Sequence, residues 1–251
     1  MIKRALMLLV VAVMVAACNS SPSQSIENNV GGANVVSSAK SPLKTASPSL
    51  TLDWGSKGQP GQVAIGVVLT YGGPKPTITP PTGWHLIRDD ATQTTRQSLY
   101  WHAVQANEPS TATWTFSDPV DTQGAVLLLD SVPTSAPIDV TSGNTGGGGT
   151  MVAKSVATTS DGDLILAFNA TDFGAYRPHM CTVCDGLNPS LPADVSVVLN
   201  HESTAREYWI LANYQNQLGD TEAIESGAPQ IFNWVAAQVA IKHAATASAT
   251  P

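Results

Sequence analysis

The sequence has few charged residues and no long apolar segment after residue 17. Only 12% of its 251 residues are Asp, Glu, Lys or Arg, the formal net charge is −7, and no run of Lys or Arg follows residue 4. Binding to nucleic acid phosphates or to anionic lipid needs clustered positive charge. The composition therefore predicts no nucleic-acid partner.

Motifs of common catalytic sites are also missing. The chain has no G-x-S-x-G, HExxH or P-loop sequence, and nothing in the spacing of its five histidines groups them. The carboxylates Asp89, Asp90, Glu202 and Glu207 would serve a glycosidase only if two of them faced each other across a cleft. Solvated strand ends are the simpler interpretation, so no catalytic residue is predicted.

The first 17 residues have the pattern of a signal peptide. Lys3 and Arg4 precede an apolar run from residue 5 to residue 17. Such a run spans roughly 20 Å as a helix, which is short of the roughly 30 Å core of a membrane. Small residues close the run, as they do before a signal-peptidase cleavage site.

The end of that run, Val15-Ala16-Ala17-Cys18, resembles the lipobox of bacterial lipoproteins. The resemblance implies that Cys18 is lipidated and becomes the first residue of the mature chain, so the membrane is a partner through this lipid. Residue 19 is Asn rather than Asp, so the usual inner-membrane retention signal is absent, and in a Gram-negative envelope the resemblance would imply the outer membrane. An ordinary secretory signal with an incidental cysteine is the alternative.

Composition divides the remainder into three parts. Residues 18–48 are rich in Ser, Asn, Ala and Pro and nearly lack large apolar residues, which predicts a flexible linker or stalk. Residues 244–251 predict a disordered tail. The expected organisation is a signal peptide at 1–17, a lipidated linker at 18–48, a folded domain at 49–243 and the tail.

The folded domain consists of short apolar runs separated by turn signals. The runs are rich in Val, Ile, Thr, Trp and Tyr, and several alternate between apolar and polar residues, as strands do. They are Leu50–Trp54, Val63–Tyr71, Trp84–Asp89, Thr95–Gln105, Thr111–Phe116, Gly124–Val132, Val152–Thr158, Asp163–Ala170, Val195–Asn200, Ala205–Tyr214 and Phe232–Lys242.

These runs predict an all-β fold, a two-sheet β-sandwich of jelly-roll type. Asp161-Gly162, between two of the runs, predicts a tight hairpin. The last run fits a strand or a helix equally well, because alanines interrupt its alternation.

One segment resembles a known pattern. Pro80-Pro81-Thr82-Gly83-Trp84, followed by Leu99-Tyr100-Trp101-His102 and Thr113-Trp114-Thr115-Phe116, is similar to the PPxGW segment of poorly characterised bacterial and phage surface domains. The resemblance implies a β-sandwich in an accessory, binding or structural role. It carries no functional residues over to this chain.

The remaining cysteines form the segment His179-Met180-Cys181-Thr182-Val183-Cys184-Asp185. Outside the cytosol the default expectation for Cys181 and Cys184 is a disulfide. A zinc site that also uses His179 and Asp185 is an alternative, although a second CxxC is missing. Calcium at Asp161 and Asp163 is another, which a simple turn explains equally well. No metal ligand or cofactor is therefore predicted.

The chain has six tryptophans and only four phenylalanines. Trp101 and Trp114 share strand faces with apolar residues and are expected in the core. On an exposed concave sheet, Trp84, Tyr100, His102 and Tyr208 would form a platform for sugar rings, because flat aromatic faces bind the C–H surface of a sugar.

These observations favour a non-catalytic binding or adhesion module that recognises a glycan, a cell-wall polymer or a surface protein. A carbohydrate-active hydrolase on a jelly-roll scaffold and a structural envelope protein are the alternatives. Fold alone does not decide among them.

Overall fold

The computed structural model consists of β-strands joined by turns and loops. It describes residues 32–55, 58–73, 75–148, 150–172, 196–202, 206–215, 219–227 and 233–244. The strands are β1 Asn34–Lys40, β2 Lys44–Asp53, β3 Val63–Tyr71, β4 Ile78–Thr79, β5 His85–Ala91, β6 Thr95–Ala103, β7 Thr111–Asp130, β8 Ile138–Gly146, β9 Thr150–Ala153, β10 Ala157–Thr158, β11 Asp163–Asp172, β12 Ser196–Glu202, β13 Arg206–Gln215, β14 Gly219–Asp220, β15 Ile224–Gly227 and β16 Asn233–Ile241. The fold is all-β, as predicted.

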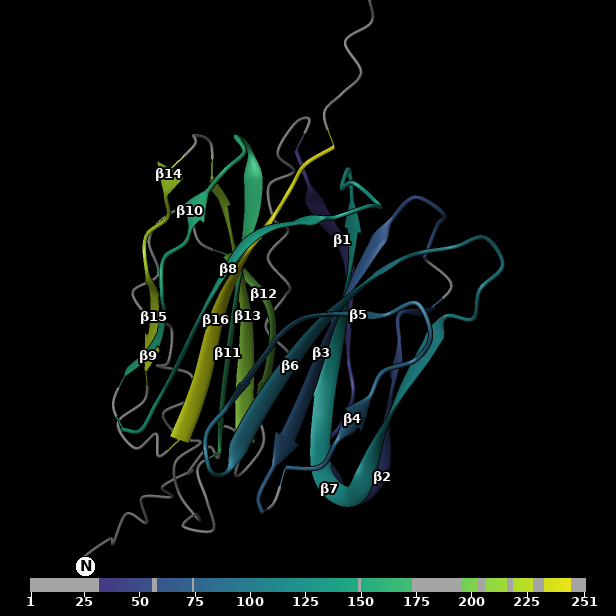
Figure 1. The fold of residues 1–251 in the computed structure, drawn as a ribbon, viewed down its shortest axis with the longest axis vertical. Helices are drawn as coiled ribbons and strands as arrows, with labels where there is room; N and C mark the ends of the chain where they lie inside the picture. Colours follow the sequence, from purple (N-terminus) through teal and green to yellow (C-terminus); the bar gives the residue numbers. More distant parts are fainter. Residues whose placement is uncertain are drawn as a thin grey trace, which may run out of the picture.

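Two antiparallel sheets form the sandwich (Figure 1). The first sheet has the order β1-β7-β3-β6-β5, with β2 and β4 also paired to β7, and the second has the order β12-β13-β11-β16-β8. Each sheet therefore collects strands from one half of the chain. The jelly-roll order expected from the sequence would alternate between the sheets.

The main core lies between the two sheets. Alternate residues of β3 and β7, such as Val67 and Leu127, face Leu166 and Phe168 of β11 and Val239 of β16, and all five side chains are buried. Burying an aliphatic or aromatic side chain of this size stabilises the fold by about 1.5–3 kcal/mol. β3 and β11 contain the runs Val63–Tyr71 and Asp163–Ala170, which the sequence predicted as strands, whereas the last run, which fitted a strand or a helix, is the strand β16.

A second apolar layer covers the outer face of the first sheet. The second half of β7 pairs with β3 as a strand of the sheet. Its first half pairs with β2, and this pair lies over the outer face of the sheet. Leu50 of β2 lies opposite Trp114 of β7, and both are fully buried against Val68 and Leu128 of the sheet. The sequence predicted two separate strands here, Thr111–Phe116 and Gly124–Val132, where the structure has one.

The outer face of the second sheet is covered by two short ribbons, β9 with β15 and β10 with β14. Gln238 of β16 lies buried beneath them and donates from Nε2 to the carbonyl oxygens of Ala153 and Glu222. These hydrogen bonds satisfy a buried polar group, and a buried donor without a partner would cost about 1–3 kcal/mol.

Two sequence expectations require correction. The described part of segment 18–48 is not a free linker, since β1 and the start of β2 pair with β7. Those strands are polar because one face of each is exposed, so composition alone hid them. Asp161-Gly162 does form a turn, with Gly162 at φ +76°, but the strands on either side of it pair elsewhere and form no hairpin.

Candidate functional site

Two histidine–tryptophan stacks lie on opposite faces of the β5–β6 hairpin. His85 is directly opposite Trp101 in the ladder, and their rings stack with centroids 4.5 Å apart and planes 26° apart. The preceding Trp84 stacks on the following His102, with centroids 5.2 Å apart and planes 19° apart. One face of the hairpin meets the second apolar layer, and the other lies at the rim of the sandwich.

The Trp84–His102 stack is buried. Trp84 is 7% exposed and His102 is 8% exposed, and Trp84 also meets Trp114 edge to face at 4.8 Å. Gly66 makes room for this packing, because a Cβ there would lie 2.8 Å from Cζ3 of Trp84. Tyr100 is 3% exposed and joins the same layer.

The predicted sugar platform at Trp84, Tyr100 and His102 is therefore wrong. The alternation correctly placed Tyr100 and His102 on the face opposite Trp101, but β2 and the first half of β7 cover that face. Tyr208 lies on β13, and its side chain is outside the described residues.

Both ring nitrogens of His102 are occupied. Nδ1 lies 2.9 Å from the carbonyl oxygen of Gly83, and Nε2 lies 2.8 Å from Oε2 of Glu108. A carbonyl oxygen accepts hydrogen bonds and so does a carboxylate, and each of these contacts engages one ring nitrogen. His102 thus ties the 104–110 loop to the hairpin, and neither nitrogen is available to a substrate.

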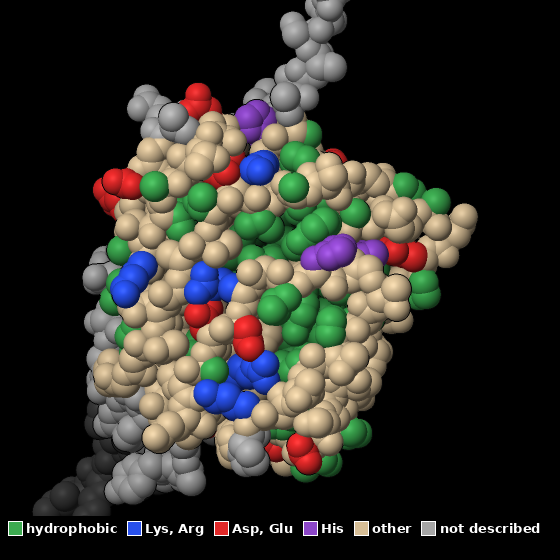
Figure 2. Space-filling view, in the orientation of Figure 1, with side chains coloured by type: hydrophobic (Ala, Val, Ile, Leu, Met, Phe, Trp, Pro, Cys, Tyr) green, Lys and Arg blue, Asp and Glu red, His purple; other side chains and the backbone are tan. Residues whose placement is uncertain are grey.

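The other stack is accessible. His85 is exposed, Trp101 is half-buried against the main core, and the neighbouring Leu86 is 56% exposed. We call His85, Leu86 and Trp101 the aromatic edge. Figure 2 shows hydrophobic side chains gathered on this side of the molecule, between β8 and β5, with a histidine beside them. Sequence reasoning expected Trp101 in the core and did not single out His85.

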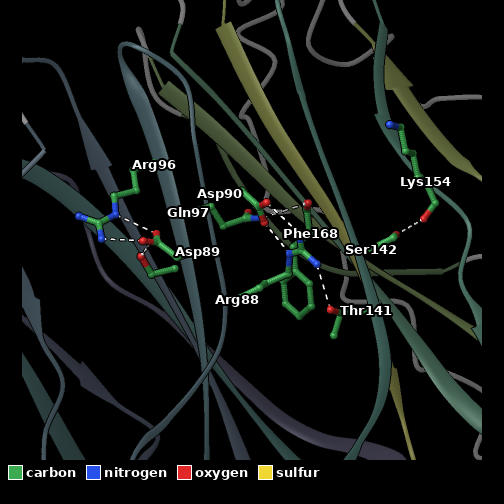
Figure 3. Close-up of polar contacts among 10 residues, drawn as sticks. Arg88, Asp89, Asp90, Arg96, Gln97, Thr141, Ser142, Lys154 and Phe168 are labelled. Carbon is green, nitrogen blue, oxygen red and sulfur yellow. Dashed lines mark hydrogen bonds and ion pairs between the residues drawn. The ribbon is translucent and has the colours of Figure 1, made fainter.

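A charged cluster lies next to the aromatic edge and joins the two sheets (Figure 3). Arg88 donates from Nε to Oδ2 of Asp90 at 2.5 Å and from Nη2 to Oδ1 at 2.8 Å. Its Nη1 donates to Oγ1 of Thr141 on β8 at 3.0 Å. Gly143 is required here, because a Cβ would lie 1.7 Å from Nη2 of Arg88. We call Arg88, Asp90 and Thr141 the sheet clamp.

Asp89 is on the opposite face of β5 from Asp90. Arg96 donates to both of its carboxylate oxygens, at 2.8 and 2.7 Å, and Ser98 donates at 2.8 Å. Burial acts to raise the pKa of Asp89, but the hydrogen bonds and charge of Arg96 outweigh it and lower the pKa. Asp89 and Asp90 thus have separate arginine partners and do not face each other across a cleft.

The other candidate residues give less information. Glu202 and Glu207 are opposite each other in the β12–β13 ladder, and their side chains lie outside the described residues. Cys18, Cys181 and Cys184 lie outside the described residues, as do His179 and Asp185. Within the described part of the chain, no group of three or more His, Cys, Asp or Glu side chains is arranged to hold a metal ion.

Comparison of the chain with protein-family models, with curated proteins and with solved structures finds no match. Among the described residues, no helix is long and apolar enough to span a membrane. The class of the protein is therefore defined by its fold and surface alone, as an all-β sandwich with an exposed aromatic edge.

Proposed function

We propose that this chain is a lipid-anchored, extracytoplasmic binding module that recognises a glycan or cell-wall polymer at its aromatic edge. The lipobox-like sequence ending at Cys18 supports the anchor and the location in the cell envelope. The observation that carries the recognition proposal is the exposed His85 ring, stacked on Trp101 beside the exposed Leu86.

The chemistry of this edge suits a sugar ring. A stacked histidine is held flat, and it offers a planar face for the C–H surface of a sugar and ring nitrogens for its hydroxyl groups. Leu86 is opposite Tyr100 in the ladder, so its exposed side chain projects from the other face of β5 and lines the edge on that side. Arg88 and Asp90 lie close by on the same strand, and their side chains remain 16% and 14% exposed.

Hydrolysis is less well supported by the same residues. His102 has no free ring nitrogen, and Asp89 and Asp90 are each held by an arginine. A general acid or base has to be within hydrogen-bond reach of the substrate. A binding role needs none of these groups to be free.

The test is to screen the full chain, in detergent micelles, on an array of glycans and cell-wall polysaccharides, with and without calcium. We expect saturable binding that His85→Ala or Leu86→Ala weakens at least about tenfold, or about 1.4 kcal/mol. Val36→Ala on β1 is the matched control, since Val36 is 46% exposed and distant in sequence from this edge.

Two results would contradict the proposal. Binding that is unchanged in His85→Ala and Leu86→Ala would place recognition elsewhere on the molecule. A folded chain that binds no glycan would remove sugar as the ligand and point to a protein partner.

A further inference from the structure

Two carboxylates from distant parts of the chain meet at one end of the second sheet. β16 lies between β8 and β11, with Ile241 paired to both Ile138 and Leu164. Asp139 follows Ile138 on β8, and Asp163 precedes Leu164 on β11. The β8 ladder shifts register here, so that Asp139 and Val140 both lie opposite Ala240. Such a bulge redirects side chains.

Asp163 is fully buried and lacks a hydrogen-bond donor. Its exposed fraction is 0%, and neither carboxyl oxygen receives a hydrogen bond. Burying an ionised carboxylate without a partner is costly, so such a group takes up a proton or finds a counter-charge. Asp163 is therefore unlike Asp89 or Asp90, each of which has an arginine.

Asp139 differs from Asp163 in having donors of its own. The backbone N–H of Thr159 donates to its Oδ2 at 2.5 Å, and the hydroxyl of Thr159 donates to its Oδ1. Asp139 also lies within hydrogen-bonding reach of Asp163. Between two carboxyl groups a hydrogen bond exists only when one of them is protonated. The donors around Asp139 favour its ionised form, which leaves the proton on Asp163.

The surrounding charges do not remove the need for that proton. Asp161, in the adjoining turn, adds negative charge, and Lys242, just after β16, adds positive charge. His243 follows Lys242 and packs against Gly162, where an added Cβ would lie 3.2 Å from its Nδ1. That Nδ1 is buried and has no hydrogen-bond partner.

We propose that Asp139 and Asp163 share one proton and form a pH-sensitive latch that fixes β8 and the 159–162 turn to the end of the second sheet. In the closed state, the protonated Asp163 donates to the ionised Asp139. Loss of the proton leaves two neighbouring carboxylates, whose repulsion the positive charge of Lys242 offsets only in part, and the strands that carry them are pushed apart.

The latch operates near neutral pH. Burial, then the hydrogen bond and charge of Asp139, raise the pKa of Asp163 to about 7. The two hydrogen bonds from Thr159 outweigh burial and lower the pKa of Asp139. β8 also carries Thr141 of the sheet clamp, so opening the latch loosens the strand that Arg88 holds against β5.

The test is hydrogen exchange of the full chain in detergent micelles, followed by mass spectrometry and corrected for the intrinsic pH dependence of exchange. One pKa unit corresponds to a tenfold change in an equilibrium constant, so between about pH 6 and about pH 8 protection of 138–146 and 157–163 is expected to fall at least about tenfold. Asp163→Asn should abolish that fall, since its amide donates to Asp139 at every pH. Asp130→Asn, on an exposed carboxylate at the end of β7, should retain it.

A carboxyl-carbon NMR titration of the unmodified chain keeps the proposal testable if Asp163→Asn does not fold. We expect one aspartate with a midpoint near neutral pH and a second resonance that responds to the same step. Protection of 138–146 that is constant across this range, or an Asp163 that titrates near pH 4, would overturn the proposal. None of these readouts depends on glycan binding.

Discussion

His85 and Trp101 are directly opposite each other in the β5–β6 ladder, and their rings stack at the surface with centroids 4.5 Å apart. One residue away along each strand, Trp84 and His102 make the reverse pair inside the molecule. The same two residue types are thus used twice, once where a ligand can reach them and once where packing fixes them.

This contrast predicts that replacing each histidine with alanine lowers the free energy of unfolding by a different amount. His85→Ala removes an exposed stack and should lower the free energy of unfolding by no more than about 1 kcal/mol. His102→Ala leaves the half-buried Glu108 without its partner and should lower the free energy of unfolding by about 2–4 kcal/mol. Chemical denaturation of the two variants measures the difference, and equal costs would show that the surface stack is structural.

Gly66→Ala should destabilise the fold by about 1–3 kcal/mol, because overpacking forces neighbours out of their preferred positions. The added Cβ would lie 2.8 Å from Trp84 and 3.1 Å from Trp114. Thermal unfolding measures the loss, and near-ultraviolet circular dichroism reports the altered packing of the indoles. A variant with unchanged stability would mean that this aromatic layer adjusts easily.

Arg88→Met should lower the free energy of unfolding by about 1–3 kcal/mol, because the half-buried carboxylate of Asp90 loses its hydrogen-bond donors. The double variant Arg88→Met with Asp90→Asn should recover part of this loss, and a double-mutant cycle measures the coupling. Additive effects of the two substitutions would show that the sheet clamp contributes little.

Asp121 is expected to stabilise the fold at neutral pH and to lose this effect in acid. Burial acts to raise its pKa, but the backbone N–H of Ala46 and the guanidinium of Arg206 outweigh it and lower the pKa. A group whose native pKa is lowered stabilises the fold above its unfolded pKa, and this contribution is lost as pH falls below about 4. Asp121→Asn should therefore be less stable than the parent chain at neutral pH and nearly equal to it near pH 2, as measured by urea unfolding.

Asp163 should affect the pH dependence of stability in the opposite direction from Asp121. Its native pKa, about 7, is above its unfolded value. The native state therefore binds the proton more tightly, and stability falls as pH rises from about 4 through about 7. Asp163→Asn should remove this slope and be the more stable protein at about pH 8, by a few kcal/mol if each pKa unit is worth about 1.4 kcal/mol. A parent chain that is as stable at pH 8 as at pH 5 would contradict this.

The sequence predicted the strands whose side chains alternate between a core and another layer. Val63–Tyr71 was predicted with the bounds that β3 has, and the ambiguous last run is β16, where pairing to both β8 and β11 settles the choice of a strand. It did not predict β1 and most of β2, since their stability comes from backbone pairing to β7 and from a few buried residues such as Leu50 and Leu52.

The candidate site was less predictable for a different reason. Alternation separates the two faces of a strand, but which face is covered depends on the pairing of β2 with β7, whose partners, such as Asp53 and Thr111, are far apart in the sequence. Asp139 and Asp163 likewise come together only because β16 returns between their strands. No local pattern contains that relationship.

Under the proposed lipid anchor at Cys18, the pairing of β1 would set how far the domain can stand from a membrane. With a lipid on Cys18, the tether ends where β1 begins, at Asn34. A fully extended chain of that length reaches at most about 55 Å, against about 110 Å for a tether running to residue 48. The shorter tether would keep the sandwich close to the bilayer, and only ligands near the membrane surface would reach His85.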